Sequence, residues 1–282
     1  MKTILITGAN GFLGTNLKKY FSKNYHVLAL GRDSLDVTDK KSVDDWFFKN
    51  KVDYVIHAAV KGGKRTDPDS FEQLVDNLTM YKNLVTHKDK FSAMFTFGSG
   101  AEFDRRKNID KVTEEKVTEC YPQDFYGLAK KLITCNVVLL DSNIYNFRLF
   151  GCYGDREPES RLIKNLVKGI KNQNIVKIDG TKEMDFFYVE DVGRAVEFYI
   201  NNQKDFLPKD VNLVYKQKYT LEQISLMVEE FYQQKNSNLS INNSQVFNYT
   251  GCADTCNDTF PESLFVGFES GLKKYLEKMN EQ

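Results

Sequence analysis

Near its start the chain carries the stretch Thr3-Ile4-Leu5-Ile6-Thr7-Gly8-Ala9-Asn10-Gly11-Phe12-Leu13-Gly14, in which a short apolar run passes directly into three spaced glycines. The apolar run predicts a buried strand over residues 3–7, and the pattern of residues 13–22 predicts an amphipathic helix. Glycines between a strand and a helix allow a tight turn and a close approach of the backbone, so the helix N-terminus can meet a pyrophosphate. We therefore predict a dinucleotide site here; the alternative is that the glycines only form the turn.

Strands and helices alternate through the first half of the sequence. The predicted strands are residues 3–7, 26–30, 54–57, 94–97 and 143–147, and the predicted helices are residues 13–22, 42–48, 71–85 and 124–141. This alternation predicts an α/β fold with a doubly wound parallel sheet of the Rossmann type, covered by helices on both faces.

After about residue 150 the alternation loosens, which predicts a smaller, mixed α/β C-terminal lobe for the substrate. The predicted elements are a helix at 161–170, a strand near 175–178, a strand-turn-helix segment at 185–201, a helix to about 232 that opens on the capping box Thr220-Leu221-Glu222-Gln223, a polar surface connection at 233–244 and a last helix at 264–279. We assign residues 1–150 and about 185–205 to the nucleotide-binding domain, and about 151–184 and 206–282 to the substrate lobe.

The composition excludes several classes of partner. Lys and Arg together number 39, as do Asp and Glu, so no net charge draws the protein to nucleic acid or to an anionic membrane. The apolar run at residues 4–6 is too short for a signal peptide or a membrane span, and we expect a cytoplasmic protein. Five cysteines form no C-x-x-C pair, and the three histidines lie far from them in sequence, so no metal site is predicted.

The end of the second predicted strand bears on the choice of cofactor. It reads Ala29-Leu30-Gly31-Arg32, with a cation where a site for NAD usually has a carboxylate that holds the ribose 2′-hydroxyl. Because an arginine suits the 2′-phosphate of NADP, we predict NADP(H), with Arg32 as a contact. Asp36 and Val37 are candidates to bracket the adenine. The alternative is that Arg32 is simply exposed on a loop.

Tyr126 and Lys130 are four residues apart in a predicted helix, and Ser99 ends the predicted strand before it. At this spacing the phenol and the ammonium share one helix face, where the positive charge lowers the pKa of the phenol and makes it a usable proton donor. The alternative is an ordinary helix with a packed tyrosine and an exposed lysine.

With the glycine turn, Ser99, Tyr126 and Lys130 in one register, the chain resembles the extended short-chain dehydrogenase/reductase family, which acts on nucleotide sugars. His57-Ala58-Ala59, Asn77, the segment 147–154 and the segment 184–192 fit the same pattern. The resemblance implies that Ser99, Tyr126 and Lys130 are catalytic, and that Lys130 also holds the nicotinamide ribose. It also implies a homodimer formed through a four-helix contact that includes the Tyr126 helix. The implied cofactor contacts are Gly8, Asn10, Gly11, Phe12, Leu13, Gly14, Arg32, Asp36, Val37, Ala58, Ala59, Lys61, Asn77, Tyr126, Lys130, Leu149 and Phe150.

Within that family, residues 31–37 and 58–63 resemble the GDP-fucose synthetase branch, which epimerises a GDP-4-keto-6-deoxy sugar at C3 and C5 and then reduces C4 with NADPH. This resemblance implies a GDP-linked substrate.

The chain departs from its relatives directly after Ser99. The family's 4,6-dehydratases carry Asp-Glu there, and the GDP-fucose synthetase branch carries a cysteine two residues after its serine; this chain has Gly100 and Ala101. The histidine that completes the epimerising pair corresponds to Arg161, and an arginine that often contacts the substrate corresponds to Met184. Alanine has no acid group and a guanidinium keeps its proton, so we expect neither dehydration nor epimerisation. The implied substrate contacts are Ser99, Gly100, Ala101 and Arg161.

These observations predict an NADPH-dependent C4 reductase of a nucleotide-linked 4-keto sugar, in the biosynthesis of a deoxy or modified sugar for surface polysaccharide. The first alternative is a 4-epimerase, which needs the same three side chains and retains NAD through its cycle. Others are an epimerase/reductase like GDP-fucose synthetase and a non-catalytic NADPH-sensing or scaffold protein. The sequence leaves open the nucleotide base, hexose or heptose, and the C4 configuration of the product.

Overall fold

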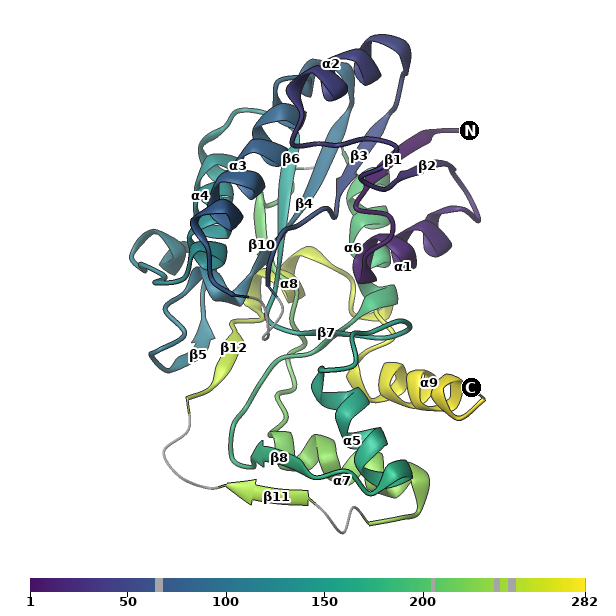
Figure 1. The fold of residues 1–282 in the computed structure, drawn as a ribbon, viewed down its shortest axis with the longest axis vertical. Helices are drawn as coiled ribbons and strands as arrows, with labels where there is room; N and C mark the ends of the chain where they lie inside the picture. The colour runs from purple at the N-terminus through teal and green to yellow at the C-terminus, as the bar shows by residue number, and fades with distance from the viewer. Residues whose placement is uncertain (64–67, 204–205, 236–238, 243–246, 282) are drawn as a thin grey trace.

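The structure is a computed structural model that describes residues 1–63, 68–203, 206–235, 239–242 and 247–281. A six-stranded sheet forms its centre (Figure 1), with the order β10-β6-β4-β3-β1-β2 and every neighbouring pair parallel. Its strands are β1 (Thr3–Thr7), β2 (His26–Leu30), β3 (Tyr54–His57), β4 (Ala93–Ser99), β6 (Ile144–Leu149) and β10 (Asp210–Asn212). The predicted parallel sheet is confirmed.

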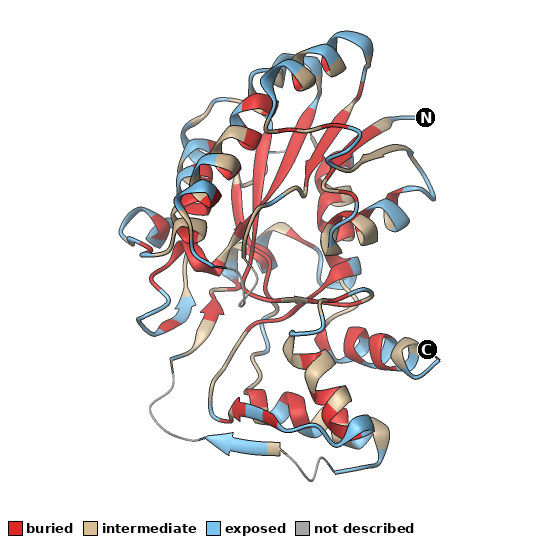
Figure 2. Ribbon diagram, viewed as in Figure 1, coloured by how far each residue is buried: buried red, intermediate tan, exposed pale blue. Residues whose placement is uncertain are grey.

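Helices cover both faces of this sheet, so the predicted doubly wound arrangement is also confirmed. On one face lie α1 (Phe12–Phe21), α6 (Val189–Asn201) and α8 (Asp254–Thr259); on the other lie α2 (Lys40–Lys49), α3 (Phe71–Val85) and α4 (Phe125–Leu139). Side chains alternate along β1, so that Ile4 and Ile6 pack with α1 and α6, whereas Leu5 packs with α2, α3 and α4. The strands are buried on both sides except at the edge strand β2, which is only partly buried (Figure 2).

A smaller lobe lies below the carboxyl end of the sheet in the view of Figure 1. It consists of α5 (Leu162–Asn172), β8 (Val176–Asp179), α7 (Leu221–Tyr232), β11 (Leu239–Asn242) and α9 (Phe268–Asn280), and it has its own apolar core. Two short parallel pairs join it to the larger part: β7 (Cys152–Tyr153) with β9 (Phe187–Tyr188), and β5 (Ile109–Val112) with β12 (Tyr249–Gly251). Four 3-10 helices complete the described elements: η1 (Lys88–Lys90), η2 (Gly100–Glu102), η3 (Glu114–Thr118) and η4 (Glu262–Leu264).

Three sequence predictions need correction. β10 and α8 lie beyond residue 205, where we ended the nucleotide-binding domain, yet both pack with the main sheet because Val211 and Cys256 belong to its core. The polar tract 233–244 contains β11, which pairs with β8. The last helix begins at Phe268, not at 264, because Gly267 has φ +84°, which interrupts a right-handed helix. The predicted capping box is confirmed: Gln223 N donates to Thr220 Oγ1 at 3.2 Å, and Thr220 N donates to Gln223 Oε1 at 2.9 Å.

None of the helices in the described ranges combines the length and the apolar character needed to cross a membrane.

Candidate active site

The glycine turn lies at the point where strand order reverses, since β2 and β3 flank β1 on opposite sides. Gly8 has φ +68°, and a Cβ built on it would lie 2.5 Å from the backbone of Ala59, which follows β3. A Cβ on Gly14 would overlap the carbonyl oxygen of Gly8. Only glycine fits both positions. Because Gly8 has no Cβ, the end of β1 can pack directly against the backbone that follows β3. In open α/β sheets such a reversal is where ligands bind.

The N-terminus of α1 is free to meet an anion. Gly11 is its capping residue and offers no side chain, and its first turn contains no acidic residue. The first backbone N–H groups of a helix have no partner within the helix, and together with the helix dipole they attract a phosphate. Phe12 and Leu13 fall in this turn, and the Asn10 amide lies against Gly31 at the end of β2. The predicted residues 8 and 10–14 thus form a cradle that suits a dinucleotide.

Arg32 follows Gly31, the residue that lies against the Asn10 amide. Its Nε donates to Asp36 Oδ2 at 3.1 Å, and its side chain is 75% exposed. Hydrogen bonds from the Thr38 hydroxyl and backbone, with that from Arg32, lower the pKa of Asp36. Val37 is buried in the core, and its carbonyl accepts from Asn83 Nδ2 at 3.0 Å.

Asn77 fixes the loop that follows β3. Its Nδ2 donates to the Lys61 carbonyl at 2.9 Å, and its Oδ1 accepts from Lys61 N at 3.0 Å. Lys61 Nζ donates to Asp76 at 2.6 Å. Asn77 is buried, and both polar groups of its side chain are bonded to the backbone of this loop. A Cβ on Gly63 would lie 2.9 Å from the Tyr126 ring, so the loop borders the predicted proton donor.

Ser99 is anchored at the carboxyl end of β4 by a capping box. Its Oγ accepts from Ala101 N at 3.2 Å, and its N donates to Glu102 Oε1 at 2.7 Å. The other oxygen of Glu102 accepts from Arg148 Nε at 2.9 Å, and the Arg148 guanidinium also reaches Asp210 at 2.7 Å. Glu102 and Arg148 are fully buried. This network was not predicted, because no local pattern in the sequence indicates it.

Tyr126 and Lys130 lie on α4, which is capped by Asp124, whose carboxylate accepts from Gly127 N at 2.7 Å. Lys130 is buried, and its Nζ donates to the Phe97 carbonyl at 2.7 Å. Burial lowers the pKa of Lys130 to about 8, against the opposing charge of Glu102. The alternative of an exposed lysine is therefore excluded.

The ammonium of Lys130 lies 5.9 Å from the centre of the Tyr126 ring. Burial raises the pKa of Tyr126, while the Ser99 hydroxyl and then the charges of Arg161 and Arg105 lower it. We predicted that Lys130 supplies the lowering charge. That role of Lys130 stays a prediction: its ammonium is directed to the Phe97 carbonyl, and the charges of Arg161 and Arg105 add to the positive charge near the phenol.

The predicted substrate contacts differ in their surroundings. Arg161 caps α5 in the smaller lobe, near enough to Tyr126 for its charge to act on the phenol. Gly100 leaves room for two rings, since a Cβ there would lie 2.5 Å from Phe150 and 2.7 Å from Tyr249. Ala101 is only 1% exposed, so its methyl group offers a substrate little surface. Leu149 and Phe150, predicted cofactor contacts, are both buried.

Two residues of this site were not predicted. Tyr249 reaches it from β12, and Arg105 follows η2 and pairs with Asp124 at 2.8 Å. Burial raises the pKa of Tyr249, and Arg105 and Ser99 oppose that effect. Neither residue belongs to a motif, and Tyr249 lies 150 residues from Ser99 in sequence. Only the pairing of β5 with β12 could have indicated it.

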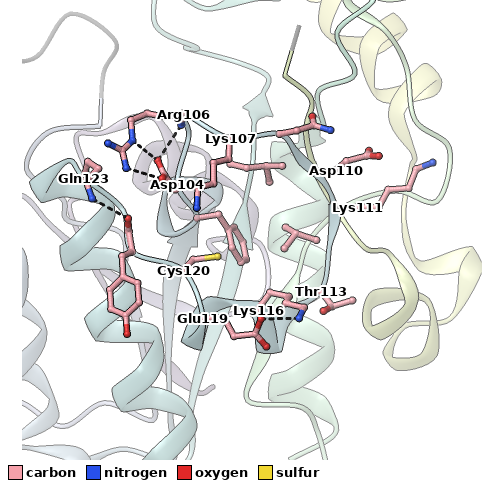
Figure 3. A pocket seen from close by; sticks show the side chains of 15 residues that line it. Asp104, Arg106, Lys107, Asp110, Lys111, Thr113, Lys116, Glu119, Cys120 and Gln123 are labelled. Atoms are coloured by element: carbon pink, nitrogen blue, oxygen red, sulfur yellow. Dashed lines mark hydrogen bonds and ion pairs between the residues drawn. The ribbon is translucent and has the colours of Figure 1, made fainter.

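A cavity of about 510 Å³ opens beside this site and contains none of the predicted site residues (Figure 3). Phe103 lines it and stacks on Phe150, at 6.1 Å between ring centres, so these two rings lie between the cavity and Gly100. Its charged lining is largely paired, as in Arg106 with Asp104 and Lys116 with Glu119.

Comparisons with known proteins agree with this geometry. A model of the NAD dependent epimerase/dehydratase family matches residues 4–213. The GDP-L-colitose synthase of Yersinia pseudotuberculosis is 26% identical over 243 residues, which cover 77% of this chain and 78% of that protein. The GDP-mannoheptose C4 reductase of Campylobacter jejuni, solved with NADP bound, is 19% identical, with a TM-score of 0.82 over 100% of this chain and 98% of that one. A GDP-L-fucose synthetase from Naegleria fowleri bound to NADP is also 19% identical, with a TM-score of 0.78 over 99% and 94%. The two solved structures share the fold of this chain.

Proposed function

The chain belongs to the NAD dependent epimerase/dehydratase family, and from this premise we propose that it is an NADPH-dependent C4 reductase of a nucleotide-linked 4-keto sugar. The observation that carries the proposal is the convergence of Ser99, Tyr126 and Lys130 beside the glycine turn, with Gly100 and Ala101 in place of a further acid or base. The relatives named as a GDP-sugar synthase and a GDP-heptose C4 reductase support the same class of reaction.

NADPH is proposed as cofactor because the residues present fit it. Gly8 and Gly14 leave the space that a Cβ would fill, and the uncapped N-terminus of α1 faces it. Arg32 provides a cation for the 2′-phosphate, and rotation of its exposed side chain away from Asp36 would release it. When bound, this cofactor supplies a hydride to C4.

Side chains of the protein then donate hydrogen bonds and a proton to the oxygen on C4. The Tyr126 phenol holds its proton at neutral pH because burial raises its pKa, so it is set to donate to the developing alkoxide. Ser99 donates to the same oxygen and stabilises its charge. Arg161 and Arg105 place positive charge near the phenol and strengthen it as a proton donor. Lys130, held in a buried position by Phe97, is proposed to orient the ribose.

We propose that epimerisation is absent. Exchange of a proton at C3 or C5 needs an acid or base beside the sugar, and Ala101 has none while Arg161 keeps its proton. Reduction with NADPH in deuterated water tests this directly: the product should carry no deuterium on C3 or C5 beyond that found without enzyme. Deuterium at either carbon would show that this chain also epimerises.

The substrate proposed is GDP-linked, of the 4-keto-6-deoxy hexose or heptose type. NADPH oxidation, followed by absorbance, should be fastest with GDP-4-keto-6-deoxymannose and slower with the dTDP- and CDP-linked 4-keto-6-deoxyglucoses. Faster oxidation with the dTDP- or CDP-linked sugar would refute the GDP assignment and leave the proposed reductase activity standing. Retention of tightly bound NAD by the purified protein, without net NADPH oxidation, would favour the 4-epimerase.

A homodimer through α3 and α4 is proposed from the apolar side chains that these packed helices expose. Phe71, Val75, Leu132, Val138 and Leu139 are all exposed. Light scattering should give twice the mass of one chain, and a Val138→Glu change should shift it toward the mass of one chain.

A further inference from the structure

Tyr249 is held rigidly between two parts of the molecule. Its strand β12 pairs with β5, where Tyr249 lies opposite Ile109. On its other side, Tyr249 N donates to the Glu183 carbonyl at 2.9 Å, and its own carbonyl accepts from Asp185 N at 3.2 Å. The Asp185 carboxylate in turn accepts from Gly251 N at 2.8 Å and is paired with Lys218. The backbone of Tyr249 is thus fixed on both edges.

The side chain of Tyr249 points from this frame to the end of β4. A Cβ built on Gly100 would lie 2.7 Å from the Tyr249 hydroxyl oxygen, so this hydroxyl rests against the residue that follows Ser99. The Phe150 ring meets the Tyr249 ring edge-on, at 5.3 Å and 70°. Gly100, which the sequence comparison marked as a lost acid position, therefore has a positive role in this structure: it admits the phenol.

The hydrogen-bonding capacity of Ser99 then decides what Tyr249 does. A serine hydroxyl has one proton to donate and two lone pairs to accept with. Ala101 N already occupies one lone pair of Ser99 Oγ. A phenol that donates to the second leaves the serine proton free to go only to Tyr126 or to a substrate oxygen.

We propose that Tyr249 is a positioning residue that donates to Ser99 Oγ and thereby directs the Ser99 proton to the C4 oxygen of the substrate. This inference deepens the proposed function and rests on it. A second consequence follows for Tyr126. With both lone pairs of Ser99 occupied, Tyr126 is not drawn to donate its proton to Ser99, and it keeps that proton for the alkoxide.

Arg105 interacts with both tyrosines and with the helix that carries Tyr126. It pairs with Asp124, the capping residue of the Tyr126 helix, and its charge acts on both phenols. Burial raises the pKa of Tyr249, so the phenol is neutral and able to donate at neutral pH. The two tyrosines, from α4 and from β12, thus both lie near Ser99, and only Tyr126 belongs to a motif that the sequence reveals.

The test is a double-mutant cycle with Tyr249→Phe, Ser99→Ala and the combined variant, using NADPH and GDP-4-keto-6-deoxymannose. Tyr249→Phe should lower kcat about tenfold with KM changed less than about twofold, the loss expected for one hydrogen bond in a buried network. If Tyr249 acts through Ser99, the change should have little further effect when Ser99→Ala is already present. Tyr219→Phe, which removes a hydroxyl bound to Glu269 in the smaller lobe, is the matched control and should leave kcat unchanged.

The possible results distinguish failure of the role assigned to Tyr249 from failure of the proposed reductase function. Tyr249→Phe with the kcat of the unaltered chain, or losses that multiply in the combined variant, would overturn the inference and leave the reductase intact. No turnover of any 4-keto sugar nucleotide by the unaltered chain would overturn the proposed function, and the inference with it. Unfolding temperature and NADPH affinity, measured on each variant, should match those of the unaltered chain, and a kcat loss that follows a fall in either would also count against the inference.

Discussion

Replacing Arg148 by methionine should strongly destabilise the protein, because this guanidinium neutralises two buried carboxylates at once. It lies 2.8 Å from Glu102 Oε2, 2.7 Å from Asp210 Oδ2 and 2.8 Å from Asn212 Oδ1. Methionine keeps most of the volume of the arginine stem but none of its donors. Removal of one partner from a buried ion pair leaves an unpaired charge and costs about 3–5 kcal/mol of the free energy of unfolding.

The cost should depend on pH. Burial raises the pKa of Asp210 to about 6 even with Arg148 present, and without the arginine this pKa should rise further. A folded-state pKa above the unfolded one means that the folded protein binds more protons, so stability falls as pH rises through that range. We therefore expect the loss to be near its full size at about pH 8 and smaller at about pH 5.5, by about 1.4 kcal/mol per pH unit as Asp210 takes up a proton.

Chemical denaturation, followed by the fluorescence of Trp46 and by circular dichroism, would measure both effects. Arg106→Met is the matched control: this arginine also pairs with a carboxylate, Asp104, but its side chain is 64% exposed, so the change should cost less than about 1 kcal/mol. Adding Glu102→Gln and Asp210→Asn to Arg148→Met should restore part of the stability, because no buried charge then lacks a partner. A loss below about 1 kcal/mol, or one that is the same at both pH values, would refute the reasoning.

Three further predictions concern the site. Tyr126→Phe should lower kcat about 10²–10⁴-fold in the reductase assay with NADPH affinity unchanged, and a variant that kept most of its activity would remove the phenol from the mechanism. Arg32→Ala should weaken NADPH binding about tenfold, measured by titration of NADPH fluorescence, while binding of NADH stays the same; equal losses for both cofactors would contradict the assigned contact. Gly8→Ala should lower the unfolding temperature and abolish NADPH binding, because φ is +68° there and the added Cβ would lie 2.5 Å from Ala59; an unchanged affinity would show that the turn does not form the site.

The larger part of the fold was predictable because its signals are local. A buried strand is an apolar run, a helix start is a capping box such as Thr220 to Gln223, and a dinucleotide turn is a set of glycines placed between the two. Each of these depends on residues close in sequence. The same holds for Tyr126 and Lys130, which share one helix face.

The parts that were missed depend on pairings between distant segments. β5 and β12 are strands of four and three residues that stabilise each other, and neither is long or apolar enough to be recognised alone. Tyr249 enters the site only through that pairing, and Glu102 shows its role only when Arg148 and Asp210 are beside it. The charge that Arg161 and Arg105 place near Tyr126 was not predicted for the same reason, since both lie on segments outside the tyrosine helix.

The surroundings of Tyr126 also bear on the direction of the reaction. A 4-epimerase must first take a proton from the C4 hydroxyl, which needs an ionised phenol, whereas a reductase must give one, which needs a neutral phenol. Burial raises the pKa of Tyr126, and the lowering effects of Ser99, Arg161 and Arg105 are smaller than that of burial. The phenol is therefore neutral at neutral pH, the state that reduction uses. Reductase activity should accordingly be level through neutral pH and fall only as the pH rises through the raised pKa, whereas a chain that relied on ionised Tyr126 would gain activity over the same range.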